Sequence, residues 1–464
     1  MLNNQASKEK RASLHGNWSS KMAFILAVTG SAVGLGNIWK FPYVAGQNGG
    51  GAFVLVYLFC VIIIGMPVMM SEILIGRRGR RNPVAAMDLL SKEENSSSKW
   101  RWVGIMGVLG GVLILSYYSV IAGWTLGYAL KSIMGVFINA SPQAVSSEFS
   151  NFVGNWKVVG FYHTLFMALT IFFVARGVEK GLEQAVKIMV PVLLILMLVL
   201  LGYAIKSGFF GQGLHFMFSV PDSCIALTQE CPLTWNSVLV ALGQAFFTLS
   251  IGMGAVMAYG AYLPEDTSII GASAAVVTAD TGIAILAGLA IFPLVFANGL
   301  DPADGPGLVF QTLPLAFGQM SDGVFFSTIF FILLSFAAWT SAIALIEPAV
   351  AWVIEQFDKT RTQASLIIGI LIWILGFGSV FSFNLLKNMI FLAGTFFDNV
   401  DYLTSNIILP FVGLLITIFA GWIMSSESSI DELDNSGFIY KSWRLLARYI
   451  APIGIILVLI NAII

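Results

Sequence analysis

The chain has 464 residues, of which 57% are hydrophobic and only 11% are charged, and its formal net charge at pH 7 is −1. Soluble domains carry about 25% charged residues, so this composition indicates a polytopic membrane protein and excludes the basic surface of a nucleic-acid-binding protein. Three cysteines are too few for a disulfide scaffold or a thiolate metal site. The polar residues 1–20 precede an apolar run too long for a cleavable signal, so we expect a cytoplasmic tail there.

Apolar runs of about 20 residues are candidate membrane spans, and we count eleven of them in the sequence. They cover residues 22–47, 52–75, 101–133, 157–175, 184–206, 235–262, 267–296, 323–356, 364–383, 389–424 and 444–463. The sequence therefore predicts an all-α membrane protein. The third, eighth and tenth runs are longer than a bilayer requires and are expected to tilt or protrude.

Basic residues gather in alternate loops, most densely between Arg77 and Arg101. By the positive-inside rule these loops are cytoplasmic, so the N-terminus is cytoplasmic and an odd number of spans places the C-terminus outside. We therefore expect a multi-pass protein of the cell (inner) membrane. Cys224 and Cys231 then lie in one external loop, where a disulfide is permitted, although the sequence leaves their pairing open.

The first run contains residues that disfavour a continuous helix. Gly30, Gly34 and Gly36 each weaken a helix by about 1 kcal/mol relative to alanine. Pro42 cannot donate a backbone hydrogen bond. Unpaired backbone groups at membrane depth are tolerated only against protein or a cavity, so a break beside the amide of Asn37 indicates a ligand or ion site. The alternative is close helix packing through small residues.

A second break is predicted in the sixth run, between Gln244 and Gly254. Gly252 and Gly254 interrupt the apolar sequence there, next to the hydroxyls of Thr248 and Ser250. Breaks at the same position in two blocks of five spans are typical of transporters built from inverted repeats, with the binding site between the repeats.

The polar side chains at these breaks and in nearby spans suit a small cation. Half-helix N-termini attract a carboxylate, whereas free carbonyls and half-helix C-termini attract a cation. The available ligands are hard oxygen donors, which favour an alkali ion over a transition metal: Asn37, Thr248, Ser250, Asp280, Thr340 and Ser341. A charge inside a span is costly, which makes Asp280 a candidate functional residue, the alternative being a residue at a helix end.

An enzyme is not expected, because the sequence offers neither a nucleophile–base pair nor a histidine cluster. The three histidines, His15, His163 and His215, are scattered along the chain. Gly34-Leu-Gly-Asn37 lacks the third glycine of a dinucleotide-binding loop, and no phosphate-binding loop is present.

Three segments carry a resemblance to a known family. Ser31–Tyr43 (SAVGLGNIWKFPY), Gln244–Gly254 and Ala337–Ser341 (AAWTS) resemble the signature segments of the neurotransmitter:sodium symporter family, and the similarity extends from about Trp18 to the last span. The chain looks most like the eleven-span bacterial amino-acid branch. The resemblance implies the LeuT fold, with inverted five-helix repeats at residues 21–206 and 235–424 and an eleventh helix at residues 444–464.

The resemblance also implies two sodium sites. The first would be built from Ala32, Asn37, Thr248, Asp280 and the carboxylate of the substrate. The second would be built from Gly30, Val33, Ala337, Thr340 and Ser341. Because the substrate would itself be a ligand of the first ion, binding of the two would be linked, and such linkage is reciprocal.

The substrate site implied by the family lies between the two breaks. It comprises Ala32, Gly34, Leu35, Gly36, Ile114, Tyr118, Phe247, Thr248, Ser250, Met253, Ser341 and Leu345. Monoamine members carry an aspartate at the position of Gly34, so a glycine there indicates an amino-acid substrate. Met253 stands where an aromatic residue is common, which favours larger hydrophobic or aromatic substrates, unless it only fills space. Chloride-dependent members carry a serine where this chain has Ala284, and Asp280 would supply the negative charge instead.

Two gates differ from the family pattern. On the outer side Lys40 replaces the usual arginine, and we place the matching acidic position near Ile390, with only Asn388 close by. Lys40 would then contact a carbonyl, a water or Asp398. On the inner side Trp18 matches the anchoring tryptophan, and His15 would face Glu355, unless His15 is a solvated tail residue and Arg11 acts in its place. Gly181 and Pro191 match a spacing at which bacterial relatives unwind the fifth span, although both residues are also common in ordinary membrane helices.

We therefore expect a sodium-coupled symporter that takes up neutral hydrophobic or aromatic L-amino acids by alternating access, without chloride. A proton-coupled amino-acid transporter and a non-transporting sensor on the same scaffold remain the alternatives. The expected partners are the amino acid, sodium and membrane lipid, with no nucleic acid and no obligatory protein partner.

Overall fold

The computed structural model describes residues 11–14, 16–220, 224, 233–300, 307–433 and 437–463. In this part of the chain the structure is helical, and the only β pairing is one bridge between Phe391 and Gly394. Cys60 is a free thiol and Cys224 is disulfide-bonded, whereas Cys231 lies outside the described residues.

The helices follow one another from Lys21 to Ile463, and the label η marks π- or 3-10-helical turns. Their bounds are α1 (Lys21–Ala32), η1 (Gly36–Lys40), α2 (Phe41–Gln47), α3 (Gly51–Cys60), η2 (Val61–Gly65), α4 (Met66–Gly79), α5 (Pro83–Glu93), η3 (Ser98–Trp100), α6 (Arg101–Ile133), α7 (Pro142–Gly154), α8 (Trp156–Ala175), η4 (Val178–Glu183), α9 (Gln184–Lys206), α10 (Phe210–Phe218), α12 (Trp235–Thr248), α13 (Ala255–Gly260), α14 (Ile269–Ala297), η5 (Leu308–Thr312), α15 (Leu313–Gly318), α16 (Gly323–Phe357), α17 (Arg361–Ser382), α18 (Phe396–Tyr402), η6 (Leu403–Ile408), α19 (Leu409–Ile418), η7 (Phe419–Ile423), α20 (Ser426–Leu433), α21 (Phe438–Leu445), η8 (Leu446–Ile450) and α22 (Ala451–Ile463).

Among the described residues, nine helical segments are long and apolar enough to cross a membrane, and the bent pair Lys21–Ala32 with Gly36–Gln47 makes a tenth. The remaining predicted span, residues 235–262, corresponds to α12 and α13. These helices have 14 and 6 residues, so each is too short to cross a membrane alone. Six residues, Leu249–Gly254, separate them. The two spans predicted to be broken are thus the two in which the helix is interrupted.

Three predicted boundaries were wrong by six or seven residues. The fifth span begins at Val178 instead of residue 184, because η4 continues into α9. The tenth span begins at Phe396 instead of residue 389, because Thr395 caps α18 together with Asp398 and the chain before it turns through Gly394. The last span begins at Phe438 instead of residue 444, because the amphipathic α21 continues into η8 and α22. Apolar content alone does not show where a helix begins, whereas a capping residue does.

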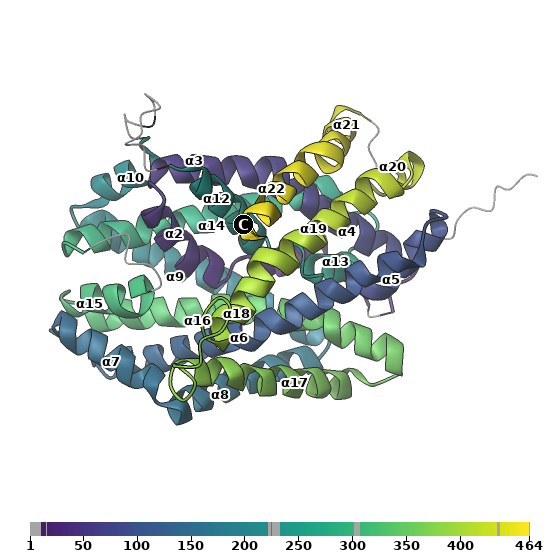
Figure 1. Ribbon diagram of the computed structural model, residues 1–464. Coiled ribbons are helices and arrows are strands. Elements are labelled where there is room, and N and C mark those ends of the chain that lie inside the picture. The colour runs from purple at the N-terminus through teal and green to yellow at the C-terminus, as the bar shows by residue number, and fades with distance from the viewer. Residues whose placement is uncertain are drawn as a thin grey trace, which may run out of the picture.

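The long helices α6 and α16 pack along each other in the interior, and most of the other spans lie roughly along the same direction (Figure 1). Buried hydroxyl pairs join them, Thr125 to Ser335 at 2.8 Å and Ser132 to Ser327 at 2.7 Å. Hydrogen bonds between spans are stable here because the alternative is an unpaired polar group in an apolar interior. This pair forms a rigid frame beside the broken spans.

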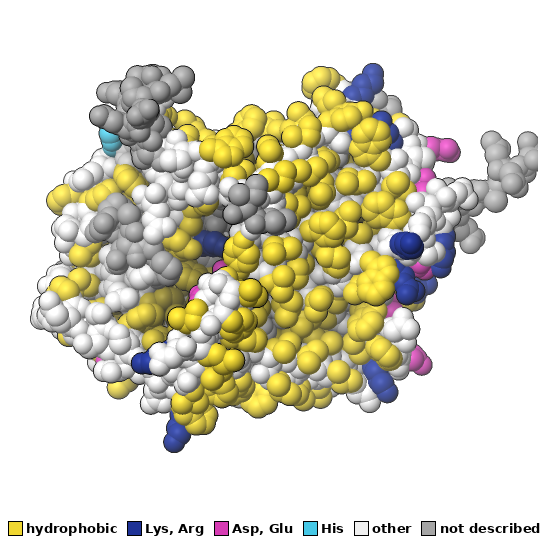
Figure 2. Space-filling model, viewed as in Figure 1, with side chains coloured by type: hydrophobic (Ala, Val, Ile, Leu, Met, Phe, Trp, Pro, Cys, Tyr) yellow, Lys and Arg dark blue, Asp and Glu magenta, His cyan; other side chains and the backbone are white. Residues whose placement is uncertain are grey.

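Charged side chains gather at one end of the molecule, on the right in Figures 1 and 2, where α5 and α20 lie. Hydrophobic side chains cover the middle of the viewed face (Figure 2). At the charged end, Arg77 pairs with Glu432 at 2.8 Å, and Arg78 pairs with Asp431 at 3.1 Å. The opposite end carries α7, α10 and α15 (Figure 1).

Candidate functional site

The first break lies between α1 and η1, where the helix axis bends by 51°. Val33 is extended, with φ −73° and ψ 99°, and its N–H still bonds to the Thr29 carbonyl at 2.7 Å. Gly30 lies inside α1, and Pro42 lies inside the continuous helical stretch Gly36–Gln47, just after the π turn η1. Neither residue lies at the break, which is confined to the stretch around Gly34.

The second break occupies Leu249–Gly254, and its backbone explains its glycines. Gly252 and Gly254 have φ of 83° and 74°, and Ser250 has φ of 53°, so the segment repeatedly visits the left-handed region. A Cβ on Gly252 would also lie 2.4 Å from the Leu409 carbonyl oxygen. Glu72 in α4 accepts the Gly252 N–H at 2.6 Å and so holds this segment in place.

Side chains from distant spans satisfy the carbonyl groups that the first break exposes. The Ser250 and Ser341 hydroxyls both donate to the Ser31 carbonyl, at 2.9 and 3.0 Å. Gln244 donates its amide to the Gly36 carbonyl at 2.9 Å. The two breaks therefore face each other, and α16 contributes to the same junction.

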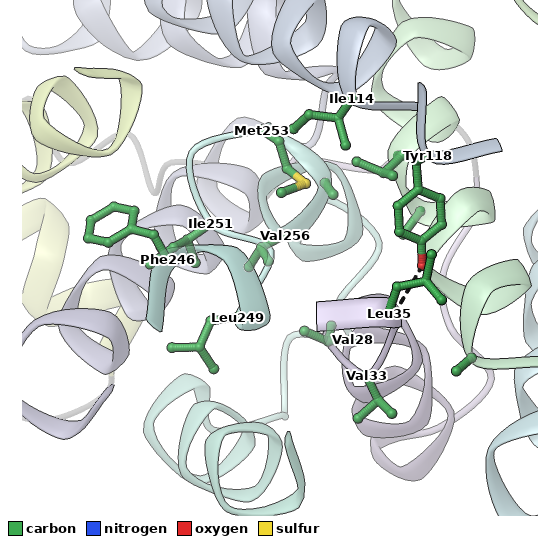
Figure 3. Close-up of a cluster of buried hydrophobic side chains, with 14 of the residues drawn as sticks. Val28, Val33, Leu35, Ile114, Tyr118, Phe246, Leu249, Ile251, Met253 and Val256 are labelled. Carbon is green, nitrogen blue, oxygen red and sulfur yellow. Dashed lines mark hydrogen bonds between the residues drawn. The ribbon is translucent and has the colours of Figure 1, made fainter. Parts of the chain in front are cut away.

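One cavity lies at this junction. All the residues predicted to bind substrate line it, except Thr248. They are Ala32, Gly34, Leu35, Gly36, Ile114, Tyr118, Phe247, Ser250, Met253, Ser341 and Leu345. The close-up in Figure 3 shows Ile114 and Met253 near each other, and the Leu35 N–H donates to the Tyr118 hydroxyl at 3.3 Å.

At Gly34 the backbone of the first break comes close to the hydroxyl groups of Ser341 and Tyr118. A Cβ there would lie 2.4 Å from the Ser341 hydroxyl oxygen and 2.9 Å from the Tyr118 hydroxyl oxygen. Real Cβ atoms do not come so close, so a side chain at this position would displace both hydroxyls. The cavity thus needs a glycine at this position for steric reasons.

The residues predicted for the first sodium site converge from three spans. The Asn37 amide donates to the Asp280 carboxylate at 2.7 Å and to the Asp280 carbonyl at 3.2 Å. Thr248 pairs with the Tyr57 hydroxyl at 3.2 Å, and Asn37, Thr248 and Asp280 are all fully buried. The second carboxylate oxygen of Asp280 has no hydrogen-bond partner among the described residues. A buried anion with a free oxygen is suited to a cation ligand.

The residues predicted for the second sodium site also meet. The Ser341 hydroxyl lies 3.4 Å from the Val33 carbonyl oxygen and 3.5 Å from that of Gly30. Thr340 bonds to the Ala337 carbonyl at 3.0 Å, one turn earlier in α16. Carbonyl and hydroxyl oxygens thus converge at the point where α1 ends. The sequence did not indicate that the Ser31 carbonyl lies among them.

The outer side of the cavity is covered by Phe247, and the ammonium group of Lys40 lies 4.3 Å from the centre of its ring. Above them is a second hollow, of about 270 Å³, whose wall includes Lys40, Tyr43, Phe247 and Ser405. Figure 2 shows a basic and an acidic side chain in the hollow near the middle of the viewed face.

The placement of the outer acidic position near Ile390 was wrong. Ile390 lies in the turn before α18 and is 72% exposed. Asp398 accepts hydrogen bonds from Thr395 within its own capping box instead of reaching Lys40. The acid beside the hollow is Asp401, which accepts the Ser405 hydroxyl at 3.0 Å. The turn through Gly394 shifts the start of the span, so counting along the apolar run placed the acidic position in the turn before α18 and missed Asp401.

The inner side is closed by the tail. Trp18 is buried, its N–H donates to the Tyr262 carbonyl at 3.0 Å, and its indole donates to the Tyr259 carbonyl at 3.2 Å. Glu355 accepts the Asn82 N–H at 2.7 Å, and His15 lies outside the described residues. Gly181 and Pro191 both lie in helical backbone, in η4 and α9, so the fifth span is wound in this structure.

Sequence reasoning missed two buried acids. Glu347 in α16 pairs with Arg361 at 2.5 Å and accepts the Tyr262 hydroxyl at 2.9 Å. Glu72, described above, holds the second break. Both are charged residues inside apolar runs, and the argument that selected Asp280 applies equally to them.

Comparison with known proteins agrees with this geometry. The model of the sodium:neurotransmitter symporter family matches residues 15–149 and 143–464. The uncharacterized sodium-dependent transporter YhdH of Bacillus subtilis (strain 168) is 38% identical over 451 residues, covering 96% of this chain and 97% of that protein. A similar uncharacterized transporter of Haemophilus influenzae is 32% identical over 457 residues, covering 96% and 97%.

One solved structure is similar throughout. The crystal structure of MhsT in complex with L-phenylalanine has a TM-score of 0.88 and 42% sequence identity, covering 96% of this chain and 99% of that one. The rat sodium-dependent neutral amino acid transporter B(0)AT2 is 30% identical over 284 residues, which is 54% of this chain and 36% of that protein.

Fold and site together define a multi-pass helical membrane transporter with two interrupted spans around a central cavity. The chain belongs to the sodium:neurotransmitter symporter family and is a sodium-dependent symporter with the LeuT fold. The predicted family and fold are confirmed.

Proposed function

We propose that this symporter takes up neutral hydrophobic or aromatic L-amino acids and that their binding is coupled to two sodium ions. The observation that carries the proposal is the cavity between the breaks, which is lined both by the apolar side chains of Ile114, Met253 and Leu345 and by Ala32, Gly34, Leu35 and Gly36 of the first break. Apolar walls with a few convergent polar groups are typical of small-molecule sites. The L-phenylalanine bound to MhsT supports a substrate of this class.

The chemistry of recognition follows from the two ends of the cavity. The Leu35 N–H and the Tyr118 hydroxyl, which bond to each other at 3.3 Å in this structure, would turn to the substrate carboxylate, because N–H groups at a helix N-terminus favour an anion. Carbonyls of Ala32 and Phe247 and the Ser250 hydroxyl would hold the ammonium group. The substrate carboxylate would complete the coordination of the first sodium ion beside Asn37, Thr248 and Asp280.

Coupling follows from this shared coordination. Sodium at the first site and the amino acid would each raise the affinity for the other, because linkage is reciprocal. The second ion, between α1 and α16 at Thr340 and Ser341, would hold the inner half of the first span closed. A potential of 100 mV supplies ~2.3 kcal/mol for each charge moved, which is enough for steep accumulation.

We further propose that transport does not need chloride and that the tail faces the cytoplasm. Asp280 is fully buried and would supply a fixed negative charge beside the first ion. The basic segment from Arg77 to Arg101 lies at the same end of the molecule as the tail, since Arg11 contacts the Arg78 carbonyl. By the positive-inside rule this end faces the cytoplasm.

A competition panel in proteoliposomes tests the substrate class. Each of the twenty amino acids competes with labelled L-phenylalanine, once in sodium and once in potassium buffer. Strong competition by phenylalanine, tryptophan and leucine in sodium only is the expected pattern. Equal competition in both buffers, or accumulation driven by a pH gradient without sodium, would favour the proton-coupled alternative.

A further inference from the structure

A network of ion pairs reaches the tail at the end of the molecule that carries α5 and α20. Arg11 contacts the Glu93 carboxylate at 2.9 Å through one guanidinium nitrogen and the Arg78 carbonyl at 3.1 Å through the other. Glu93, the last residue of α5, also pairs with the Arg78 guanidinium. Glu93 is thus shared between the tail and the end of α4.

Helix α20 holds Arg78 in position for this pair. The Arg78 guanidinium donates to Asp431 at 3.1 Å and to the Ser428 carbonyl at 3.3 Å. The side chain of Arg78 is only 7% exposed, whereas that of Arg11 is 38% exposed. Burial raises the pKa of Glu93, but the hydrogen bonds and charges of Arg78 and Arg11 outweigh it and hold the pKa below its usual value. Glu93 therefore stays ionised at neutral pH.

The tail has a second attachment a few residues further on. Trp18 packs against Tyr259 with ring centres 5.2 Å apart, and the Ser19 N–H donates to Glu183 at 3.0 Å. In this attachment Trp18 is buried and Ser19 is exposed, and together they connect the tail to α13 and to the fifth span. The ionic attachment at Arg11 is accessible to solvent.

We propose that Arg11, Glu93 and Arg78 form an electrostatic latch that holds the tail against α5 and must release before the Trp18 attachment can open. The latch rests on the proposed function only in that release of the tail opens the inner side. An exposed pair is screened by salt, with a Debye length of about 8 Å at 0.15 M. The latch would therefore make tail release sensitive to ionic strength, whereas the packing of the buried Trp18 would not.

Amide hydrogen exchange on the purified full-length protein tests the latch without transport. The readout is the exchange rate of the peptide covering residues 16–24, which contains the Trp18 and Ser19 N–H groups. Glu93→Gln and Arg11→Gln should each accelerate it on the order of two- to fivefold at low salt, as expected for a partly exposed pair. The double variant should exchange no faster than either single variant.

Glu94→Gln is the matched control. Glu94 is the neighbouring acid, and its carboxylate accepts the Ser425 N–H at 3.1 Å instead of contacting the tail. This variant should leave exchange of the tail unchanged. Peptides of α6 and α16 should exchange at the same rate in every variant, which excludes general unfolding.

Salt supplies a second, independent readout. Raising it should accelerate tail exchange more in the wild type than in Glu93→Gln, because the Lys187–Glu183 pair beside Ser19 responds to salt in both proteins. The latch is refuted if both single variants exchange like the wild type, if Glu94→Gln accelerates exchange as much as Glu93→Gln, or if the salt response is as large in Glu93→Gln as in the wild type. Sodium-driven uptake is a separate measurement, so a failure of the latch leaves the proposed function untouched.

Discussion

The side-chain amide of Asn37 donates to the carboxylate of Asp280 at 2.7 Å, and neither residue is exposed. The contact joins the first broken span to α14 across the interior. The same carboxylate keeps one oxygen without a partner among the described residues. A charge held in this way is stable only if a cation neutralises it or a proton is taken up.

The first prediction concerns the charge of Asp280. Asp280→Asn keeps an oxygen that can accept from Asn37 but removes the negative charge beside the proposed first ion. The sodium concentration for half-maximal uptake should rise by about tenfold or more, equivalent to ~1.4 kcal/mol or more. Replacing chloride by gluconate should leave uptake by the wild type unchanged, and a wild type that requires chloride would contradict the role given to Asp280.

The second prediction concerns the hydroxyl of Ser341. Ser341→Ala removes the donor that faces the carbonyls at the end of α1, so sodium dependence of uptake should shift several-fold to higher concentration. Ser335→Ala is the matched control on the same helix, since its hydroxyl bonds only within the α6–α16 frame. Equal shifts in the two variants would show that the effect is structural.

The third prediction concerns the space at Gly34. Gly34→Ala places a methyl group within 2.4 Å of the Ser341 oxygen, and overpacking of this kind costs about 1–3 kcal/mol. If the bound state bears this cost, binding of labelled L-phenylalanine should weaken on the order of five- to 150-fold. Gly282→Ala in α14 serves as control, because a Cβ there meets nothing within 4 Å. Unchanged binding by Gly34→Ala would show that the cavity is not the substrate site.

The fourth prediction concerns the buried pair of Glu347 and Arg361. Glu347→Gln leaves the Arg361 guanidinium without its anion, and breaking one partner of a buried pair costs about 3–5 kcal/mol. The melting temperature in detergent should fall by several degrees, and the double variant Glu347→Gln/Arg361→Gln should recover part of the loss. Lys359→Gln, at an exposed neighbouring position, should leave the melting temperature unchanged. A similar fall in the melting temperature of Lys359→Gln would argue against a specific effect of the Glu347–Arg361 pair.

Much of the fold could be predicted because its signals are local. Apolar runs gave the spans, and the glycines at 252 and 254 gave the second break, since a left-handed backbone leaves few alternatives. The first break was located only approximately. Gly30 and Pro42 look like helix breakers in sequence, yet Gly30 lies inside α1 and Pro42 lies inside the helical stretch Gly36–Gln47, after its π turn.

Contacts that depend on the path of the chain between spans could not be predicted from the sequence. The turn through Gly394 decides that Asp401, rather than a residue near Ile390, bonds to Ser405 in the wall of the outer hollow. Glu347 and Arg361 are close in sequence, but the reversal between α16 and α17 is what brings them together. The acid Glu72 could have been found, because the rule that identified Asp280 applies to it as well.

The central claim is that sodium and an amino acid complete one another's coordination between the two broken spans. Uptake of labelled L-phenylalanine into proteoliposomes, under an inward gradient of either sodium or potassium, tests it most directly. We expect accumulation with sodium alone, and an apparent substrate affinity that rises with sodium concentration. Equal uptake in potassium, or an affinity for the amino acid that does not change with sodium, would contradict the claim.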